Sequence, residues 1–280
     1  MLFVVNPLSG KGRNAVLGEK ISKMGCKVAY TTSVDQTLSI VQSSDDEVVV
    51  AVGGDGTVNA VAHALLGSGR TLGIIPTGSG DGLARYLGLP RNNRKALDIV
   101  FKGNTRPLDV GVVDGHPFVS VCGVGFDALV SENFAKCGQR GLKNYIRQAL
   151  RAWKKYKAEY YCIRIDGSTV FEGAATLITI GNSDQWGNNA RIAPGADCSD
   201  GLLDVSVILP VKTRNLPHLA LLLMNGHLNK SSRVLGFKGE NICITRSGEG
   251  PAHIDGDNFH AGKMLNVSIR KGALKVISSK

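Results

Sequence analysis

Residues 48–59 read Val48-Val49-Val50-Ala51-Val52-Gly53-Gly54-Asp55-Gly56-Thr57-Val58-Asn59. The aliphatic run predicts a buried strand, and the apolar pattern from Val58 to Leu66 predicts a helix. A strand therefore runs into a glycine turn that opens a helix. This geometry aims backbone N–H groups and a positive helix end at one point, which favours a phosphate. The turn also carries a carboxylate and a hydroxyl, which indicates nucleotide chemistry rather than simple anion binding.

Two further loops repeat this arrangement. The strand-like run Leu2–Val5 leads into the glycine loop 6–13, and Leu72–Ile75 leads into the loop 76–82. In open α/β sheets, ligands bind beyond the carboxyl ends of the strands, so the three loops can converge on one ligand. One glycine turn alone is usually just a tight turn, and none of the three matches the P-loop or dinucleotide fingerprint. Their joint occurrence favours a nucleotide.

Composition limits the class of protein. Hydrophobic residues make up 43% and charged residues 20% of the 280-residue chain, as in ordinary globular proteins. No apolar run approaches the ~20 residues that span a bilayer. No leader pattern opens the chain, and the six cysteines are scattered, which predicts a reduced, cytoplasmic protein.

The net charge of +10 predicts anionic partners such as phosphate substrates or membranes. An aromatic content of 6%, without a stacking motif, argues against nucleic acid. The segment Gln139–Tyr161 alternates seven cations with apolar residues and predicts a basic amphipathic helix. Such a helix either rests on anionic headgroups or packs with a solvated basic face; the sequence leaves both open.

The pattern of predicted secondary structure changes near Pro107. Residues 1–108 alternate strand and helix, which predicts a parallel α/β domain. Residues 109–270 are mostly short strand-like segments, with hairpin turns at Asp114-Gly115 and Asp166-Gly167. The fold class predicted is therefore α/β plus β, with a nucleotide-binding domain followed by a β-rich domain.

Taken together, these loops resemble the diacylglycerol kinase catalytic-domain family, which includes bacterial diacylglycerol kinases and sphingosine and ceramide kinases. The resemblance spans essentially the whole chain. It rests on Asn6-Pro7-x-Ser9-Gly10, Gly53–Asn59, Pro76-x-Gly78-Ser79-Gly80, Gly82–Arg85, Leu108–Gly111, Gly123–Asp127, Asp200–Asp204 and Asp255-Gly256-Asp257. It implies a Rossmann-like N-terminal domain, a β-sandwich lipid-substrate domain and an active site in the cleft between them. It also implies that a strand near 271–280 returns to the first domain.

The reaction that the resemblance implies is transfer of the ATP γ-phosphoryl group to a hydroxyl of a membrane lipid, either diacylglycerol or a sphingoid- or ceramide-like lipid, with Mg²⁺. Such an enzyme would take part in lipid metabolism and phospholipid biosynthesis, as a cytoplasmic protein peripheral to an anionic membrane. A homodimer stays open. The nucleotide contacts implied are Asn6, Pro7, Ser9, Gly10, Lys11, Thr32, Gly54, Asp55, Gly56, Thr57, Asn59 and Ser79.

Two carboxylates are the catalytic candidates. Asp55 would act through Mg²⁺ or through the substrate hydroxyl; alternatively it only caps the following helix. Asp257 would accept the hydroxyl proton, although the family usually has glutamate there, one carbon longer. Asp81 replaces the usual asparagine and needs a metal or cation to neutralise it beside phosphates. Gly82 replaces the aspartate of diacylglycerol kinases, so the substrate stays open.

A second metal site is implied at Asp197, Asp200 and the carbonyl of Leu202, whose oxygens suit Mg²⁺ or Ca²⁺. The alternative is an ordinary turn before a strand. Two other functions remain: a soluble-substrate kinase of the NAD kinase type, which shares only the Asp55 turn, and a non-catalytic lipid- or nucleotide-binding protein.

Overall fold

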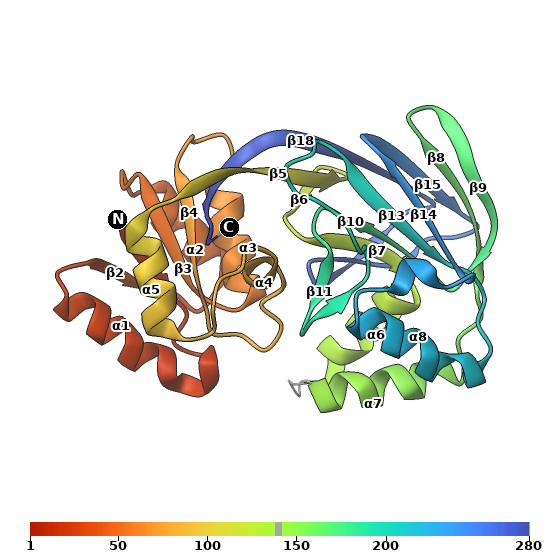
Figure 1. Ribbon diagram of the computed structural model, residues 1–280, viewed down its shortest axis with the longest axis horizontal. Coiled ribbons are helices and arrows are strands. Elements are labelled where there is room, and N and C mark those ends of the chain that lie inside the picture. The colour runs from red at the N-terminus through yellow and green to blue at the C-terminus, as the bar shows by residue number, and fades with distance from the viewer. Residues whose placement is uncertain (138–141, 280) are drawn as a thin grey trace. The chain divides into compact units, whose positions relative to one another are not determined.

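The computed structural model describes residues 1–137 and 142–279, apart from the side chains of residues 11, 134, 135, 137 and 142–145. The chain divides into two compact units, which are described separately (Figure 1). Unit 1 comprises Met1–Val110 and Lys271–Lys280, and unit 2 comprises Gly111–Arg270. Two strands, β5 (Thr105–Val113) and β18 (Met264–Ile277), run from one unit into the other.

Unit 1 is built on a parallel sheet. Its strands run in the order β2 (Lys27–Tyr30), β1 (Leu2–Val5), β3 (Val48–Gly53), β4 (Thr71–Pro76) and the end of β18. Adjacent pairs are parallel, with Val4 opposite Ala51 and Val52 opposite Ile75. The aliphatic run of β3 is buried on both faces, as expected for a central parallel strand.

Helices connect these strands. They are α1 (Arg13–Lys23), α2 (Val34–Gln42), α3 (Asp55–Leu65), α4 (Gly82–Tyr86) and α5 (Asn93–Lys102), with a 3₁₀ turn η1 (Gly10–Gly12) before α1. Leu17 and Ile21 of α1 and Ala96 of α5 pack on Phe3 and Val50, so α1 and α5 share one face of the sheet. α2 packs against α3.

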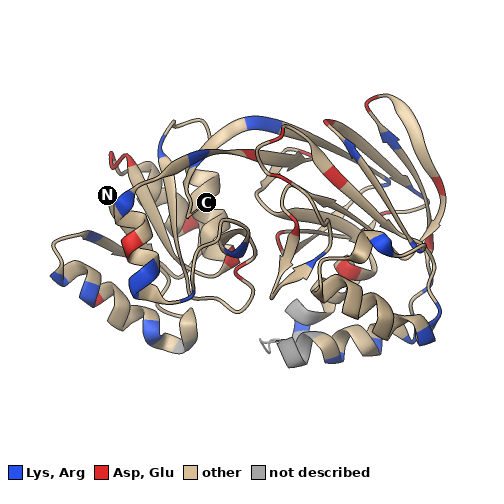
Figure 2. Cartoon of the chain, in the orientation of Figure 1, with Lys and Arg blue, Asp and Glu red and all other residues tan. Residues whose placement is uncertain are grey.

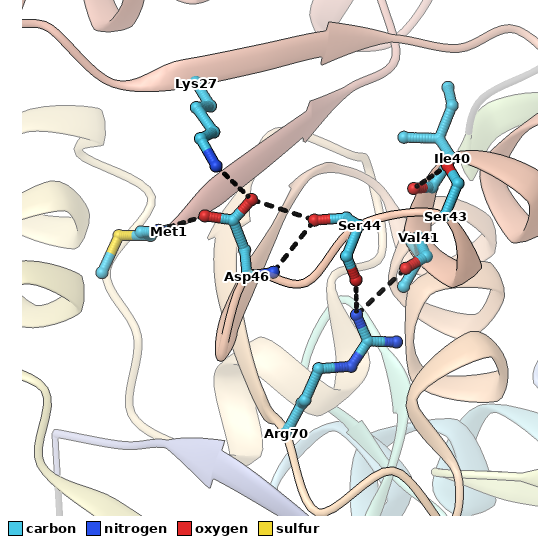
Figure 3. Close-up of polar contacts among 8 residues, drawn as sticks. All are labelled: Met1, Lys27, Ile40, Val41, Ser43, Ser44, Asp46 and Arg70. Carbon is cyan, nitrogen blue, oxygen red and sulfur yellow. Dashed lines mark hydrogen bonds and ion pairs between the residues drawn. The ribbon is translucent and has the colours of Figure 1, made fainter.

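A polar cluster ties together the amino ends of the strands (Figure 3). Asp46 accepts hydrogen bonds from the Met1 ammonium group at 2.7 Å, from Lys27 at 3.1 Å and from Ser44 at 2.9 Å. The Met1 hydrogen bond is the main cause that lowers the pKa of Asp46 to about 2. Arg70 donates to the carbonyls of Val41 and Ser44. This cluster lies at the opposite end of the strands from the three glycine loops.

Unit 2 contains two layers of antiparallel strands. One sheet has the order β14 (Val234–Gly239), β13 (Leu203–Ile208), β10 (Leu177–Gly181), β7 (Val121–Gly125), β16 (Gly250–Ile254) and β17 (Asp257–Ala261). The other contains β18, β15 (Asn241–Arg246), β8 (Glu159–Ile165) and β9 (Ser168–Ala175), with β5 paired to β6 (His116–Phe118). Val124 and Ile178 of the first sheet join Ile163 and Ile244 of the second in one core. The predicted combination of α/β and β-rich domains is confirmed.

The remaining elements of unit 2 are short. They are α6 (Phe126–Cys137), α7 (Leu142–Trp153), α8 (Leu216–Met224), the 3₁₀ turns η2 (Thr213–Asn215) and η3 (Leu228–Lys230), and the small hairpin of β11 (Gln185–Gly187) and β12 (Ala190–Arg191). Among the helices that the structure describes, none is long and apolar enough to cross a membrane.

The predicted basic helix is shorter than the sequence pattern indicated. α7 ends at Trp153, and residues 159–161 already belong to β8. The prediction of a helix through Tyr161 is therefore wrong, because Tyr161, Ile163 and Ile165 alternate inward as in a strand. Residues 138–141, where that helix was expected to begin, lie outside the described residues.

Both predicted hairpin turns are confirmed. Asp114-Gly115 joins β5 to β6 and Asp166-Gly167 joins β8 to β9, with positive φ at all four residues. A two-residue hairpin loop with this backbone matches the twist of its strands.

Candidate active site

Three loops follow the carboxyl ends of neighbouring parallel strands in unit 1. They begin at Asn6 after β1, at Gly54 after β3 and at Thr77 after β4. Because β3 pairs with both β1 and β4, the loops lie side by side at one edge of the sheet. Backbone hydrogen bonds join them, from Asn6 N–H to Val52 O at 3.1 Å and from Thr77 N–H to Gly53 O at 2.9 Å.

A buried side chain that the sequence reasoning missed joins the first and third loops to the end of β3. The amide of Asn14, in the first turn of α1, donates to Thr77 Oγ1 at 2.8 Å, to Asn6 O at 3.0 Å and to Val52 O at 3.4 Å. Only 1% of Asn14 is exposed. A β-carbon on Gly10 would lie 2.6 Å from Asn14 Oδ1, so the first loop needs glycine at this position. Asn14 therefore fixes the spacing of the loops.

The second and third loops touch through two glycines. A β-carbon on Gly78 would lie 2.6 Å from the Cα of Gly54, and one on Gly54 would lie 3.1 Å from the Cα of Gly78. Any side chain at Gly78 would force these backbones apart. Gly54 is also the N-cap of α3, whose first amides have no partner within the helix. The touching loops thus form an edge where a helix N-terminus can receive a phosphate.

Asp55 holds the third loop. Its Oδ2 accepts the N–H of Asp81 at 2.9 Å, and its Oδ1 accepts the N–H of Gly82 at 2.8 Å. The carboxylate therefore caps the N-terminus of α4. The alternative interpretation from the sequence was that Asp55 caps the helix that follows it, α3. Burial raises the pKa of Asp55, and these backbone hydrogen bonds oppose that rise.

Asp81 lies beside Asp55 and is 3% exposed. Its Oδ1 accepts the N–H of Gly78 at 2.8 Å, and its Oδ2 lies 3.4 Å from Nε of Arg91. Burial, followed by the charge of Asp55, raises the pKa of Asp81 to about 6. The cation that the sequence reasoning required at Asp81 is present as Arg91, which that reasoning did not identify.

The other predicted nucleotide contacts lie around these loops. Asn6 Nδ2 donates to Thr57 Oγ1 at 3.5 Å, which joins two of them directly. Thr32 is exposed just after β2, at the same edge of the sheet, and Ser79 is exposed in the third loop. Of the remaining predicted contacts, Pro7, Ser9, Gly10 and Lys11 lie in the first loop, and Gly56 and Asn59 lie in the first two turns of α3. The side chain of Lys11 lies outside the described residues.

The second candidate catalytic residue belongs to unit 2. Asp257 begins β17 and is exposed, directly after the two-residue turn Asp255-Gly256. Asp255 has φ +49°, and its carboxylate accepts the N–H groups of Val119, Ser120 and Val121 at 2.7–2.9 Å. This anchor fixes the hairpin tip that presents Asp257.

A buried histidine lies behind this hairpin. His253 Nε2 is 2.9 Å from Asp127 Oδ2, which also accepts a hydrogen bond from Thr179 at 3.1 Å. A β-carbon on Gly123 would lie 2.6 Å from the same Asp127 oxygen. The Gly123–Asp127 motif was noted in the sequence without a role; in the fold, its glycine makes room for the aspartate–histidine pair.

The predicted second metal site lies in the loop before β13. The N–H of Asp200 donates to the carbonyl of Asp197 at 3.2 Å, and the N–H of Leu202 donates to Asp200 Oδ1 at 3.0 Å. Lys238 Nζ lies 3.3 Å from Asp200 and 3.1 Å from Asp204. The oxygen donors suit a hard cation, but a metal would share Asp200 with this ammonium group. Within residues 1–137 and 142–279, no group of three or more His, Cys, Asp or Glu residues suits a metal ion.

A parallel-sheet unit with three clamped glycine loops, followed by a β-sandwich unit, defines the class of two-domain phosphotransferases. Residues 1–113 match the diacylglycerol kinase catalytic domain, and residues 120–278 match the YegS C-terminal NAD kinase beta sandwich-like domain. The chain belongs to the diacylglycerol kinase catalytic-domain family. It is accordingly a kinase with a hydroxyl group as acceptor.

Relatives match over nearly the whole chain. A diacylglycerol kinase of Mycobacterium tuberculosis strain H37Rv is 31% identical, covering 98% of this chain and 93% of its own. The diacylglycerol kinase of Bacillus subtilis strain 168 is 26% identical over 91% of this chain and 88% of its own. A solved structure from Bacillus anthracis strain Sterne, proposed to be a diacylglycerol kinase, has a TM-score of 0.83 at 25% identity and covers 99% of this chain and 96% of its own.

An NAD kinase from Archaeoglobus fulgidus in complex with ATP shares the fold alone. Its TM-score is 0.56 at 12% identity, and the match covers all of this chain and 94% of the other.

Proposed function

We propose that this kinase transfers the γ-phosphoryl group of ATP, bound as its Mg²⁺ complex, to the hydroxyl of a membrane lipid. Diacylglycerol is the first acceptor to test, because the relatives named above are called diacylglycerol kinases. The observation that carries the proposal is the Asn14 clamp, which ties the first and third glycine loops to the end of β3 at one edge of the sheet. Phosphoryl transfer depends mainly on the positioning of the phosphates and on stabilisation of their charge, and loops held at fixed spacing provide the positioning.

In this proposal, unit 1 binds the nucleotide. Backbone N–H groups of Gly54–Gly56, at the start of α3, would hold the phosphates, as at other helix N-termini. Each Asp55 oxygen accepts one backbone hydrogen bond, which leaves a lone pair on each. This donor set fits Mg²⁺, which proteins usually bind through one or two carboxylates together with substrate phosphates. Mg²⁺ would supply charge neutralisation on the phosphates.

Asp257 is the proposed general base. It would accept the proton of the lipid hydroxyl as that oxygen attacks the γ-phosphorus, while ADP leaves. Its exposed position on an anchored hairpin leaves the carboxylate accessible to a substrate. Geometry comes before pKa for such a base, so the fixed hairpin matters more than the carboxylate's intrinsic basicity.

Unit 2 would hold the lipid. A cavity of about 400 Å³ lies between α6, the end of α7 and the strands, with apolar walls from Leu129, Ala152 and Pro251. Lys155, Arg246 and Glu159 put charges of both signs in its lining. This mixture of apolar and charged groups suits an acyl chain that carries a polar head.

The exposed side of α7 is the proposed membrane contact. Ile146 is 48% and Leu150 59% exposed, next to Arg147 and Arg151. Figure 2 shows Lys and Arg residues, in blue, along the ribbon of α7. At the end of the helix, Trp153 packs edge-on against Phe126 at 5.1 Å, which ties α7 to α6. Apolar tips beside cations match the boundary between acyl chains and anionic headgroups, so the enzyme would act peripherally on the cytoplasmic membrane face.

The test is transfer of labelled phosphate from ATP in mixed micelles of diacylglycerol, sphinganine, ceramide or phosphatidylglycerol. One labelled lipid, absent when Mg²⁺ is chelated, is the expected result. ATP binding without any labelled lipid would instead favour the non-catalytic reading, with the aspartate at position 257 too short to serve as base.

A further inference from the structure

Arg91 and the buried carboxylate of Asp81 both bind the backbone of the third glycine loop. Arg91 Nη2 donates to the carbonyl of Gly78, while its Nε lies 3.4 Å from Asp81 Oδ2. The other oxygen of Asp81 accepts the Gly78 N–H at 2.8 Å. The Arg91 guanidinium therefore binds the carbonyl of Gly78, and the Asp81 carboxylate binds the N–H of the same residue. Together the two side chains hold the third loop in place.

The loop would otherwise present two carboxylates to the nucleotide. Asp55 accepts the N–H of Asp81 itself, so the second acidic side chain lies directly beside the first. Asp81 Oδ2 is buried and, among the described residues, receives no hydrogen bond; its one ion pair there is with Arg91. Two like charges in one site disfavour each other and any approaching phosphate.

Two cations face Asp81. Arg85 donates its Nε to the carbonyl of Gly80 at 3.0 Å and is held on the backbone. Arg91 alone, among the residues that the structure describes, forms an ion pair with Asp81. Its side chain is 54% exposed and the Asp81 side chain 1%, so the arginine can be replaced without opening a core.

We propose that Arg91 is a positioning residue for the nucleotide: its guanidinium neutralises the Asp81 carboxylate, which itself holds the Gly78 N–H of the third loop, so that phosphates can bind beside it. This inference rests on the proposed function in unit 1. It predicts that Arg91 supports nucleotide binding only while residue 81 is a carboxylate. It also predicts that the loss of affinity on replacing Arg91 increases with the negative charge of the nucleotide.

The experiment is calorimetric titration of the full chain with ATP, ADP and AMP in the presence of MgCl₂. Arg91→Gln should weaken ATP binding about tenfold, because it leaves the buried Asp81 charge without its partner. The loss should decrease from ATP to ADP to AMP. Asp81→Asn alone should bind ATP within about twofold of the parent protein, because an amide can still accept the Gly78 N–H.

The double variant Arg91→Gln/Asp81→Asn separates charge compensation from other roles. It should recover ATP affinity to within about threefold of Asp81→Asn, since no buried charge remains to be neutralised. Arg91→Lys, which keeps a charge, should bind ATP better than Arg91→Gln. The matched control is Arg94→Gln, an exposed arginine at the start of α5, which should change nothing.

Two results would overturn the inference while leaving the proposed function intact: Arg91→Gln binding ATP like the parent protein, or a double variant as weak as Arg91→Gln. An equal loss for ATP and AMP would also overturn it, because it would indicate a purely structural effect. Failure of the parent protein to bind ATP would overturn the proposed function and this inference together.

Discussion

The side-chain amide of Asn14 donates a 2.8 Å hydrogen bond to the hydroxyl of Thr77, across 63 positions of sequence. The same amide reaches the carbonyls of Asn6 and Val52, so one buried group ties the first and third glycine loops to the end of β3, which leads into the second loop. The backbone hydrogen bonds from Asn6 to Val52 and from Thr77 to Gly53 each join only two of the three segments.

Removal of this amide should therefore damage both stability and nucleotide binding. Asn14→Ala removes the side-chain donor to Thr77 Oγ1 and the second donor to the Asn6 and Val52 carbonyls, and it should lower the free energy of unfolding by about 2 kcal/mol. Urea unfolding checks this, with Asn104→Ala as the control at an exposed asparagine. Equal unfolding free energies for the two variants would show that the clamp does not hold the loops.

Asp257 should matter for chemistry and not for nucleotide binding. Asp257→Ala should lower kcat about 10²- to 10⁴-fold, the usual contribution of a general base. The KM for ATP should stay unchanged, because the residue lies in unit 2. Asp257→Glu should retain activity, and Glu249→Ala, at an exposed carboxylate of the same unit, serves as the control. An Asp257→Ala enzyme with the parent kcat would remove the residue from the mechanism.

The buried Asp81 carboxylate should cost stability at neutral and high pH. Its folded pKa of about 6 lies above the ordinary 3.8, so the folded state holds its proton more tightly. The penalty is thus complete above about pH 6 and absent below 3.8. Asp81→Asn should raise the free energy of unfolding by about 2 kcal/mol at pH 8, and the gain should shrink towards pH 4. A gain that is constant from pH 8 to pH 4 would contradict the assignment.

The exposed side of α7 should control membrane binding. Reversal of two cations in Arg147→Glu/Arg151→Glu should weaken binding to vesicles containing phosphatidylglycerol at least about 30-fold, at ~1 kcal/mol per cation. Lys20→Glu/Lys23→Glu, with the same charge change on α1, is the matched control. If both variants lose binding equally, net charge rather than α7 drives the association.

The sequence predicts the local elements of unit 1 well because its central strands are buried on both faces. An unbroken run such as Val48–Val52 leaves little choice of structure. Long-range pairing is harder to predict. β18 is one strand of 14 residues, whose start pairs with β15 and whose end pairs with β4. The sequence pattern ended the β-rich segment at residue 270, and only the family resemblance implied that a strand near 271–280 returns to the first domain. In the structure β18 continues through Gly272, which has a positive φ.

The candidate site shows the same limit. The glycine loops can be recognised in the sequence, because only glycine allows the close approach of Gly54 to Gly78. Asn14 and Arg91 do not, because a single polar residue in a helix or turn looks like any solvated one. Their partners lie 8 to 63 positions away for Asn14 and 13 positions away for the Gly78 carbonyl bound by Arg91, so only the fold reveals them.

The most direct test of the central claim is transfer of labelled phosphate from ATP to diacylglycerol in mixed micelles, comparing the parent protein with Asp55→Asn and with Asp98→Asn, an exposed aspartate of α5. In Asp55→Asn an NH₂ group replaces one of the two oxygens that accept the Asp81 and Gly82 N–H groups, so the variant should lose at least about 10²-fold in rate, while Asp98→Asn keeps the parent rate. Labelled phosphatidic acid in that pattern is the predicted result. An Asp55→Asn enzyme as active as the parent, or a parent that labels no lipid of the panel while binding ATP, would contradict the account.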